Sequence, residues 1–455
     1  MITLRRIPYY GMIALLAYMP FHIFWSQWLS LATGGLSGWK IAKDIFAFLV
    51  LIISLGLMSR RQKPPLYVKL LLLAITYGLL HLLVYSLNRD TTWQVAGLAT
   101  VYNTRLFWFL LIGMAVAYLM PKQIDQTKLM KIVLVVSTIV CVFGVAQYLL
   151  PKDLLTHFGY SVERGVKPIF FIDDKPDLPR VMSTLRDPNS LGAFLLVPLT
   201  IITLFLLQKW QNKNARTLLL GLFGLHILTL LLTFSRAAWA GAIIALSLAL
   251  GLKFKSQIIK TTRRFWPFLA LGLVTIIAGA FLLRDQYFIQ NVIFHSDETT
   301  TAQLDSNDLH VEFIKKGVGG IQNKPLGHGP GTAGIVSIQN KNGSYLTENY
   351  YVQIAHEVGI AGLVLFMALL AIVLWTLYRK EPGILEVALL ATSIAYALMA
   401  LLMHLWTNEA VAAQWWLLAG FCLGASTITR SGKVQKAMQP GIIAERKQTK
   451  RGFNG

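Results

Sequence analysis

The sequence predicts an all-α polytopic integral membrane protein, with about 12 transmembrane helices and two long extracytoplasmic loops. Of its 455 residues, 55% are hydrophobic and only 14% are charged, and the mean hydropathy is +0.56. This composition is typical of membrane proteins and excludes an ordinary soluble domain. Apolar stretches of about 20 residues, the length that crosses a bilayer as a helix, recur along the chain.

The expected spans follow one another from the N-terminus. No small-residue cleavage site follows the first apolar run, so we expect it to be a span and not a removed signal. A tight turn joins the seventh and eighth spans, for which a broken or re-entrant pair is the alternative. Cys141 and Cys422 lie inside spans and indicate neither a disulfide nor a metal site. In order, the expected spans cover residues 8–27, 39–58, 67–86, 100–119, 130–149, 188–207, 217–234, 236–253, 265–283, 352–377, 384–403 and 408–427.

The distribution of Lys and Arg orients these spans. Basic residues crowd the N-terminus, the loops after the even-numbered spans and the tail, as Arg60, Lys122 and Lys209 illustrate. The positive-inside rule then places both termini in the cytoplasm. The net charge of +21 therefore reflects the membrane topology. Nucleic acid is not an expected partner, because the sequence has no stretch in which basic and aromatic residues alternate to hold a strand. We expect one transmembrane domain over residues 1–429 and a basic cytoplasmic tail, 430–455, against anionic membrane lipids.

Two of the extracytoplasmic loops, at about 150–187 and 284–350, are too long to be simple connections and are expected to be functional. Within the second loop, the polar run from Asp305 to Asp308 provides N-caps for a short helix near 306–322. Four short strings lie at the ends of long apolar segments: TLRDPN at 184–189, TFSR at 233–236, GHGPG at 327–331 and ENYYVQIAHEVGIAG at 348–362. The topology puts all four on one face of the membrane.

Arginines in two of these strings predict an anion site. Arg186 precedes the sixth span, for which Asn189 or Ser190 is the expected N-cap, and a helix N-terminus beside guanidinium groups favours an anion. Arg236 is followed by small residues that let helices approach closely and hold the guanidinium inside the bundle. Because an arginine fork binds phosphate oxygens bidentately, a phosphate-bearing lipid is the expected ligand. For Arg236 the alternative is snorkelling to the headgroups.

The alternative for Arg186 is a pair with an acid such as Asp187, and Arg180 is as readily a surface charge as a ligand. In the glycine-rich string, His328 is a general base, a phosphate donor or a residue that stabilises the turn. Asn349, Gln353 and His356 share one helix face by their spacing, with Glu348 at its outer edge. For these polar residues the alternative is a role in closing helix contacts at the membrane rim.

The strings STLRDPNSLGAFL, LTFSRAAWAG, GHGPG and ENYYVQIAHEVGIAGLVLF together resemble the O-antigen ligase and polymerase superfamily, over about residues 180–375. The resemblance implies a glycosyltransferase of the bacterial inner membrane that needs no metal or other cofactor. It implies a glycan donor on undecaprenyl diphosphate, met at the extracytoplasmic face in cell-surface polysaccharide or lipopolysaccharide assembly. Arg186 and Arg236 would bind the diphosphate, together with Arg180 and Asn189. Ligases of this superfamily carry histidine where this chain has Glu348, so ligase and polymerase both stay open.

The chemistry predicts the remaining roles. A sugar, lipid or other hydroxyl acceptor attacks the anomeric carbon, arginines stabilise the leaving diphosphate in place of a metal ion, and a base takes the proton. We expect His328 as the base with Glu348 orienting it, and His356 as the next choice. Asn349 and Gln353 would position the acceptor. Asp173–Asp174 is the one pair of acids in the outer loops that suggests a metal site instead. A transporter or flippase of a lipid-linked glycan or other anionic lipid is the main alternative function, and a scaffold of an envelope-synthesis complex is the second.

Overall fold

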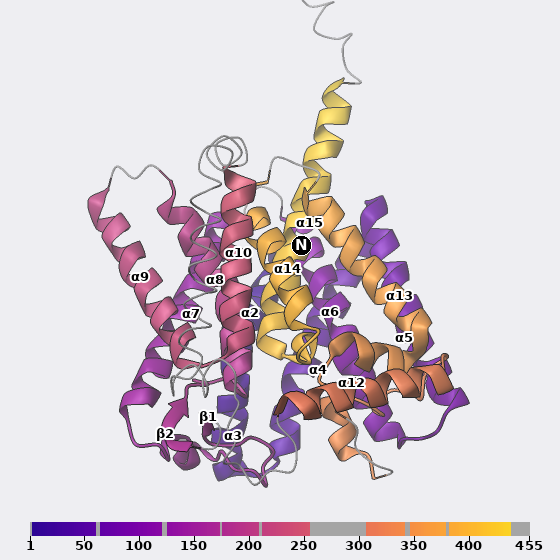
Figure 1. The fold of residues 1–455 in the computed structure, drawn as a ribbon. Coiled ribbons are helices and arrows are strands. Elements are labelled where there is room, and N and C mark those ends of the chain that lie inside the picture. The colour runs from indigo at the N-terminus through magenta and orange to yellow at the C-terminus, as the bar shows by residue number, and fades with distance from the viewer. Residues whose placement is uncertain are drawn as a thin grey trace, which may run out of the picture.

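The computed structural model describes residues 2–60, 64–120, 125–172, 175–208, 212–254, 306–341, 346–378 and 382–437. Long helices stand side by side in a bundle, which confirms the all-α membrane fold (Figure 1). Within the described ranges, nine helices are long and apolar enough to cross a membrane. The expected span at 265–283 lies outside those ranges, so the total of twelve is not tested.

The helices match the expected spans closely. The first span is built from α2, η1 and α3, because Pro20 interrupts the α-helix with a 3-10 turn. The bounds are α1 Ile2–Arg5, α2 Ile7–Tyr18, η1 Met19–Phe21, α3 His22–Thr33, α4 Leu36–Ser59, α5 Pro65–Leu87, α6 Trp93–Leu119, α7 Gln126–Leu149, η2 Leu154–Phe158, β1 Phe170–Ile172, β2 Lys175–Arg180, α8 Pro188–Leu206, α9 Lys213–Leu232, α10 Arg236–Lys253, α12 Ser306–Asn323, η4 Ile335–Gln339, α13 Tyr350–Tyr378, α14 Ile384–Met399, η5 Leu405–Thr407 and α15 Glu409–Ala437.

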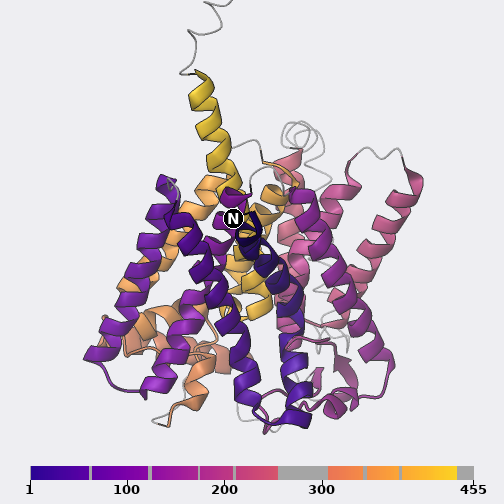
Figure 2. The same cartoon turned by 180° about the vertical axis from the view of Figure 1, so that it is seen from behind.

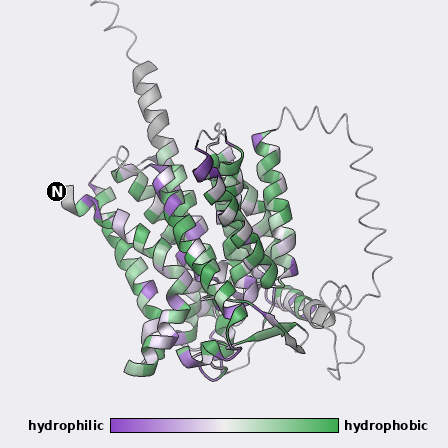
Figure 3. Cartoon of the chain, turned by 90° about the vertical axis from the view of Figure 1, so that its left-hand side faces the viewer, coloured by the Kyte–Doolittle hydropathy of each residue, from purple (hydrophilic) through white to green (hydrophobic). Residues whose placement is uncertain are grey.

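The outer surface of the bundle suits a lipid environment. Large apolar side chains such as Leu72, Leu79 and Leu83 of α5 are more than half exposed. Figure 3 shows hydrophobic residues along the flanks of the helices. In water such a surface would be unfavourable, so it indicates contact with acyl chains.

Small residues bring the central helices into close contact. A Cβ atom on Gly113 of α6 would collide with the Leu417 carbonyl of α15, and one on Gly192 of α8 would collide with Ala238 of α10. The small residues after Arg236 therefore do what the sequence predicts, since they let α10 pack against α8 and α14. The first residues of α10 are held inside the bundle by this packing.

The two ends of the bundle differ. The N-terminus and the last turns of α15 lie at one end, whereas β1, β2 and α12 lie at the other, which we call the loop end (Figures 1 and 2). β1 and β2 form a small antiparallel sheet within the first long loop, with Phe170 opposite Arg180. The helix expected near 306–322 is present as α12, which lies across the bundle axis (Figure 1).

All four sequence strings lie at the loop end (Figure 1). α8 begins there, the turn between α9 and α10 lies there, and the chain runs from α12 into the start of α13 there. α13 contains a kink at Gly359, whose φ of 77° breaks the helix. α14 stops at Met399, four residues before the end of the expected 384–403 span. The segment after it, up to Asn408, forms part of the site described next.

Candidate functional site

A pocket of about 770 Å³ opens at the loop end and gathers many of the predicted residues. One group of lining side chains comes from β2, α8 and α10, and another comes from the start of α13 and the α14–α15 segment. The lining consists of Arg180, Arg186, Asp187, Asn189, Ser190, Phe234, Arg236, Ala237, Ala240, Ile335, Glu348, Leu402, Met403, His404, Thr407, Asn408 and Glu409. Five of the nine predicted site residues are therefore brought together: Arg180, Arg186, Asn189, Arg236 and Glu348.

The N-terminus of α8 is capped by Asp187, and not by Asn189 or Ser190 as the sequence suggested. Asp187 Oδ1 accepts a hydrogen bond from the Ser190 amide at 2.8 Å, and its Oδ2 accepts one from Ser190 Oγ at 2.7 Å. Pro188 then occupies the first helical position, where its missing N–H costs nothing. Both oxygens of Asp187 thus bond to Ser190. The described part of the chain contains no ion pair between Arg186 and Asp187, which was the alternative for Arg186.

Arg180 joins the two elements on its side of the pocket. Its Nε donates to the Thr233 carbonyl at 3.0 Å, and its Nη2 donates to Asn189 Oδ1 at 2.9 Å. The neighbouring Val181 amide donates to the Leu232 carbonyl at 2.9 Å. Arg180 is therefore fixed in the wall of the pocket by these contacts and is not a plain surface charge.

Arg236 is the first residue of α10 and lines the pocket, so this helix end, with its free amides, lies at the pocket. Ser235 is the N-cap, with its Oγ 3.4 Å from the Ala238 amide. The preceding Phe234 has a φ of 48°, which tightens the turn from α9 into α10. Two helix N-termini, those of α8 and α10, thus contribute to one pocket that also carries three arginines.

Backbone strain is concentrated at this pocket. Ser183, Phe234 and Glu348 are the non-glycine residues with positive φ among the described residues, and the last two line the pocket. Left-handed backbone at a non-glycine residue is unfavourable and persists where the surrounding structure enforces it, often at functional sites. The φ of 46° at Glu348 therefore indicates that the surrounding fold holds this residue at the pocket wall.

The residues after Glu348 support the pocket from behind. Asn349 Oδ1 accepts hydrogen bonds from the Tyr351 and Val352 amides, both at 3.0 Å, so this side chain caps α13. Gln353 Oε1 lies 2.8 Å from His404 Nδ1, which makes Gln353 a partner of a lining residue. Neither Asn349 nor Gln353 is among the described lining residues, and their contact with the acceptor stays a prediction.

His328 and His356 lie together in a different place. Their rings stack with centroids 4.1 Å apart, and the His328 amide donates to the His356 carbonyl at 2.8 Å. His328 Nε2 is 3.0 Å from the Gly320 carbonyl oxygen of α12. Neither histidine is among the described residues that line the pocket. The glycine-rich string is thus docked onto α12 and α13 and does not reach over the arginines.

Glu357 fastens this string to the bundle. Its Oε1 accepts from the Gly331 and Ala333 amides at 3.1 and 3.2 Å, and its Oε2 accepts from Asn103 Nδ2 at 2.8 Å. The side chain is fully buried. A buried carboxylate that satisfies three donors is a structural clamp, because losing it leaves those donors without an acceptor.

Glu357→Gln is expected to lower the free energy of unfolding by about 1–3 kcal/mol, because the new amide group meets donors where the carboxylate accepted hydrogen bonds. Thermal unfolding of the purified protein in lipid nanodiscs measures the loss as a lower Tm. Glu163→Gln, at an exposed acid of the first long loop, is the matched control. An unchanged Tm for Glu357→Gln would contradict the clamp.

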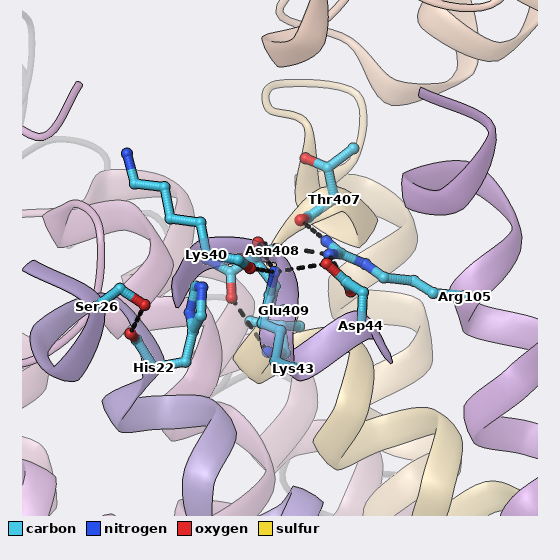
Figure 4. A network of polar contacts seen from close by, with 10 residues as sticks. His22, Ser26, Lys40, Lys43, Asp44, Arg105, Thr407, Asn408 and Glu409 are labelled. Atoms are coloured by element: carbon cyan, nitrogen blue, oxygen red, sulfur yellow. Dashed lines mark hydrogen bonds and ion pairs between the residues drawn. The ribbon is translucent and has the colours of Figure 1, made fainter. Parts of the chain in front are cut away.

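Sequence reasoning missed a buried ionic network beneath the pocket (Figure 4). Lys43 and Asp44 of α4, Arg105 of α6 and Glu409 of α15 are each less than 10% exposed and form ion pairs with one another. Their presence inside apolar spans was the available signal, since ionisable residues within the membrane are costly and mostly functional. His404, also missed, lies in the short connection between the expected spans 384–403 and 408–427.

Metal ligation finds no support in the described residues. No group of three or more His, Cys, Asp and Glu side chains is arranged there to hold a metal ion. Asp173 and Asp174, the pair that suggested a metal site, lie outside those residues. Whether the reaction is independent of metal therefore stays a prediction.

No curated protein matches the chain. Residues 219–367 match the family model Wzy_C, described as O-antigen ligase. The matched region contains Arg236, the glycine-rich string and Glu348, while Arg186 lies ahead of it. This match supports the resemblance drawn from the four strings, three of which lie within the matched residues.

Proposed function

We propose that this protein is a glycosyltransferase of the bacterial inner membrane that moves a glycan from undecaprenyl diphosphate to an acceptor hydroxyl. The observation that supports it most is the pocket in which Arg180, Arg186 and Arg236 meet two helix N-termini. Guanidinium groups and free helix amides both favour phosphate oxygens. The basic loops at the opposite end of the bundle favour an extracytoplasmic position for this pocket.

The reaction needs two chemical tasks from the pocket. The acceptor oxygen bonds to the anomeric carbon as the bond from that carbon to the diphosphate breaks, and the electron pair leaves on undecaprenyl diphosphate. The arginines stabilise the charge that develops on this leaving group. The proton of the acceptor hydroxyl goes to a base beside the same anomeric carbon.

The base that we propose is Glu348, in place of His328, which the sequence favoured. Glu348 lines the pocket together with Arg186 and Arg236, whereas His328 stacks on His356 and contacts Gly320. A general base has to come within hydrogen-bond reach of the proton it removes. Glu348 also occupies the position at which related ligases carry a histidine, which fits an exchange of one base for another.

The product assay tests this function and separates it from transport. The purified protein is incubated with a radiolabelled glycan on undecaprenyl diphosphate, with and without a hydroxyl acceptor. Release of undecaprenyl diphosphate with transfer of label supports the enzyme, and movement of intact donor between leaflets without cleavage supports a flippase. Longer lipid-linked chains identify a polymerase, and label on a separate acceptor identifies a ligase.

Metal independence gives a further expected result. Transfer should keep its rate in the presence of EDTA, because arginines and helix amides neutralise the leaving diphosphate in place of a divalent ion. The measurement is the initial rate before and after chelation. Loss of activity that magnesium or manganese restores would contradict this prediction and direct attention to Asp173 and Asp174.

A further inference from the structure

The buried ionic network has a composition that the diphosphate site does not explain. It contains two cations, Lys43 and Arg105, and two carboxylates, Asp44 and Glu409, so its formal charges balance. Lys43 Nζ lies 2.8 Å from Asp44 Oδ2 and 3.6 Å from Glu409 Oε1. Arg105 Nη1 lies 3.4 Å from Glu409 Oε1 and 3.8 Å from Asp44 Oδ1. Three helices that are distant in the chain are tied together by these pairs (Figure 4).

Stability alone is a weak reason for such a network. Removing four charges from water is costly, and well-packed apolar side chains often replace buried ion pairs without loss of stability. Arg105 is fully buried, and its Nε has no hydrogen-bond partner among the described residues. Its Nη2 donates to the Thr407 carbonyl, which lies in the segment that lines the pocket.

Glu409 connects the network with the pocket. The side chains of Lys43 and Arg105 are each 1% exposed and that of Asp44 is 8% exposed, while that of Glu409 is 11% exposed and lines the pocket. Two buried cations at 3.4–3.6 Å favour the ionised form of this carboxylate. The pocket lining therefore combines the three arginines with His404, Asn408 and Glu409 of the α14–α15 segment.

We propose that Glu409, held by Lys43, Asp44 and Arg105, is the binding site for the acceptor, and that the acceptor group bound there is a neutral sugar with free hydroxyls. An ionised carboxylate only accepts hydrogen bonds, so it can bind hydroxyl donors and offers no donor to phosphate oxygens. The two substrates would therefore bind to different groups, the diphosphate to the arginines and the sugar hydroxyls to Glu409. This inference rests on the proposed function, since it assigns the second substrate of the same pocket.

Kinetics of the Glu409→Gln variant test the proposal. A hydrogen bond to a charged group corresponds to about tenfold to a hundredfold in binding, so the KM for the acceptor should rise by that amount. The KM for the lipid-linked donor should stay within about twofold, because the arginines are unchanged. Glu163→Gln, at an exposed acid outside the pocket, is the control.

A second variant keeps the test decisive if Glu409→Gln does not fold. Lys43→Met combined with Glu409→Gln restores the charge balance of the network and should show the same selective rise in acceptor KM. An unchanged acceptor KM, or an equal rise in both KM values, in a folded variant would overturn the proposal. If the wild-type protein does not cleave the donor at all, the proposed function fails, and that outcome differs from both results for the variants.

Discussion

Replacing Arg236 by lysine is expected to lower kcat/KM by about 10²- to 10³-fold, the effect typical of removing one donor that stabilises a developing oxyanion. Arg236 lies at the N-terminus of α10 and lines the pocket. Lysine keeps the charge but lacks the planar fork that binds two phosphate oxygens at once. The measurement is the steady-state rate of glycan transfer from the lipid diphosphate donor.

Arg216→Lys is the matched control for this experiment, because Arg216 is an exposed arginine near the start of α9, at the opposite end of the bundle. Both variants should reach the membrane and purify with the same elution profile. Turnover of Arg236→Lys within about twofold of the wild type would show that a point charge suffices, and the bidentate contact would have to be abandoned.

Replacing Glu348 by glutamine should lower kcat by about 10²- to 10⁴-fold, the range for loss of a general base. Glutamine has nearly the same shape but cannot take the proton, so binding of the donor should change little. The same assay on His328→Ala should show a much smaller loss of kcat, because this imidazole lies with His356 outside the described pocket lining.

The paired design decides between two bases. An inactive His328→Ala variant beside an active Glu348→Gln variant would restore the assignment expected from the sequence alone. Such a result would require the glycine-rich string to leave its contacts with Glu357 and reach the arginines. Donor binding has to be measured in both variants, so that loss of chemistry is separated from loss of substrate.

Hydropathy was a sound guide to the fold because each membrane helix satisfies its own backbone and needs only an apolar surface. The described helices follow the expected spans within a few residues at most ends. The small sheet of β1 and β2 was not expected, since β2 contains Pro176 and Pro179 and lacks the alternation of a typical strand. The early end of α14 was not visible either, because the residues after Met399 are as apolar as those before it.

For the site, the sequence indicated which segments meet but not which side chains face the pocket. Arg186 and Arg236 were predicted because a guanidinium group beside a helix N-terminus favours the binding of an anion. Asn349 shares its helix face with Gln353 and His356, yet its oxygen is used to cap α13. Helical spacing cannot distinguish a cap from a ligand, since both place a polar residue at the first turn.

The ionic network, in contrast, consists of functional candidates that the sequence did not indicate. Lys43, Arg105 and Glu409 come from three spans that lie far apart in the chain, and no local pattern joins them. Each lies within the first few residues of an expected span, where snorkelling to the membrane surface is an ordinary expectation. Only the packing of α4, α6 and α15 brings the charges within ion-pair distance of one another.

Equilibrium binding of undecaprenyl diphosphate to the purified protein is the most direct test of the claim that the arginine pocket holds the donor's diphosphate. Wild type should bind the diphosphate at least tenfold more tightly than a variant with Arg186→Gln and Arg236→Gln, since each lost charge-assisted contact corresponds to about tenfold or more. Undecaprenol, which has the same lipid tail without phosphates, should bind both proteins equally. Equal affinity of the two proteins for the diphosphate would contradict the account.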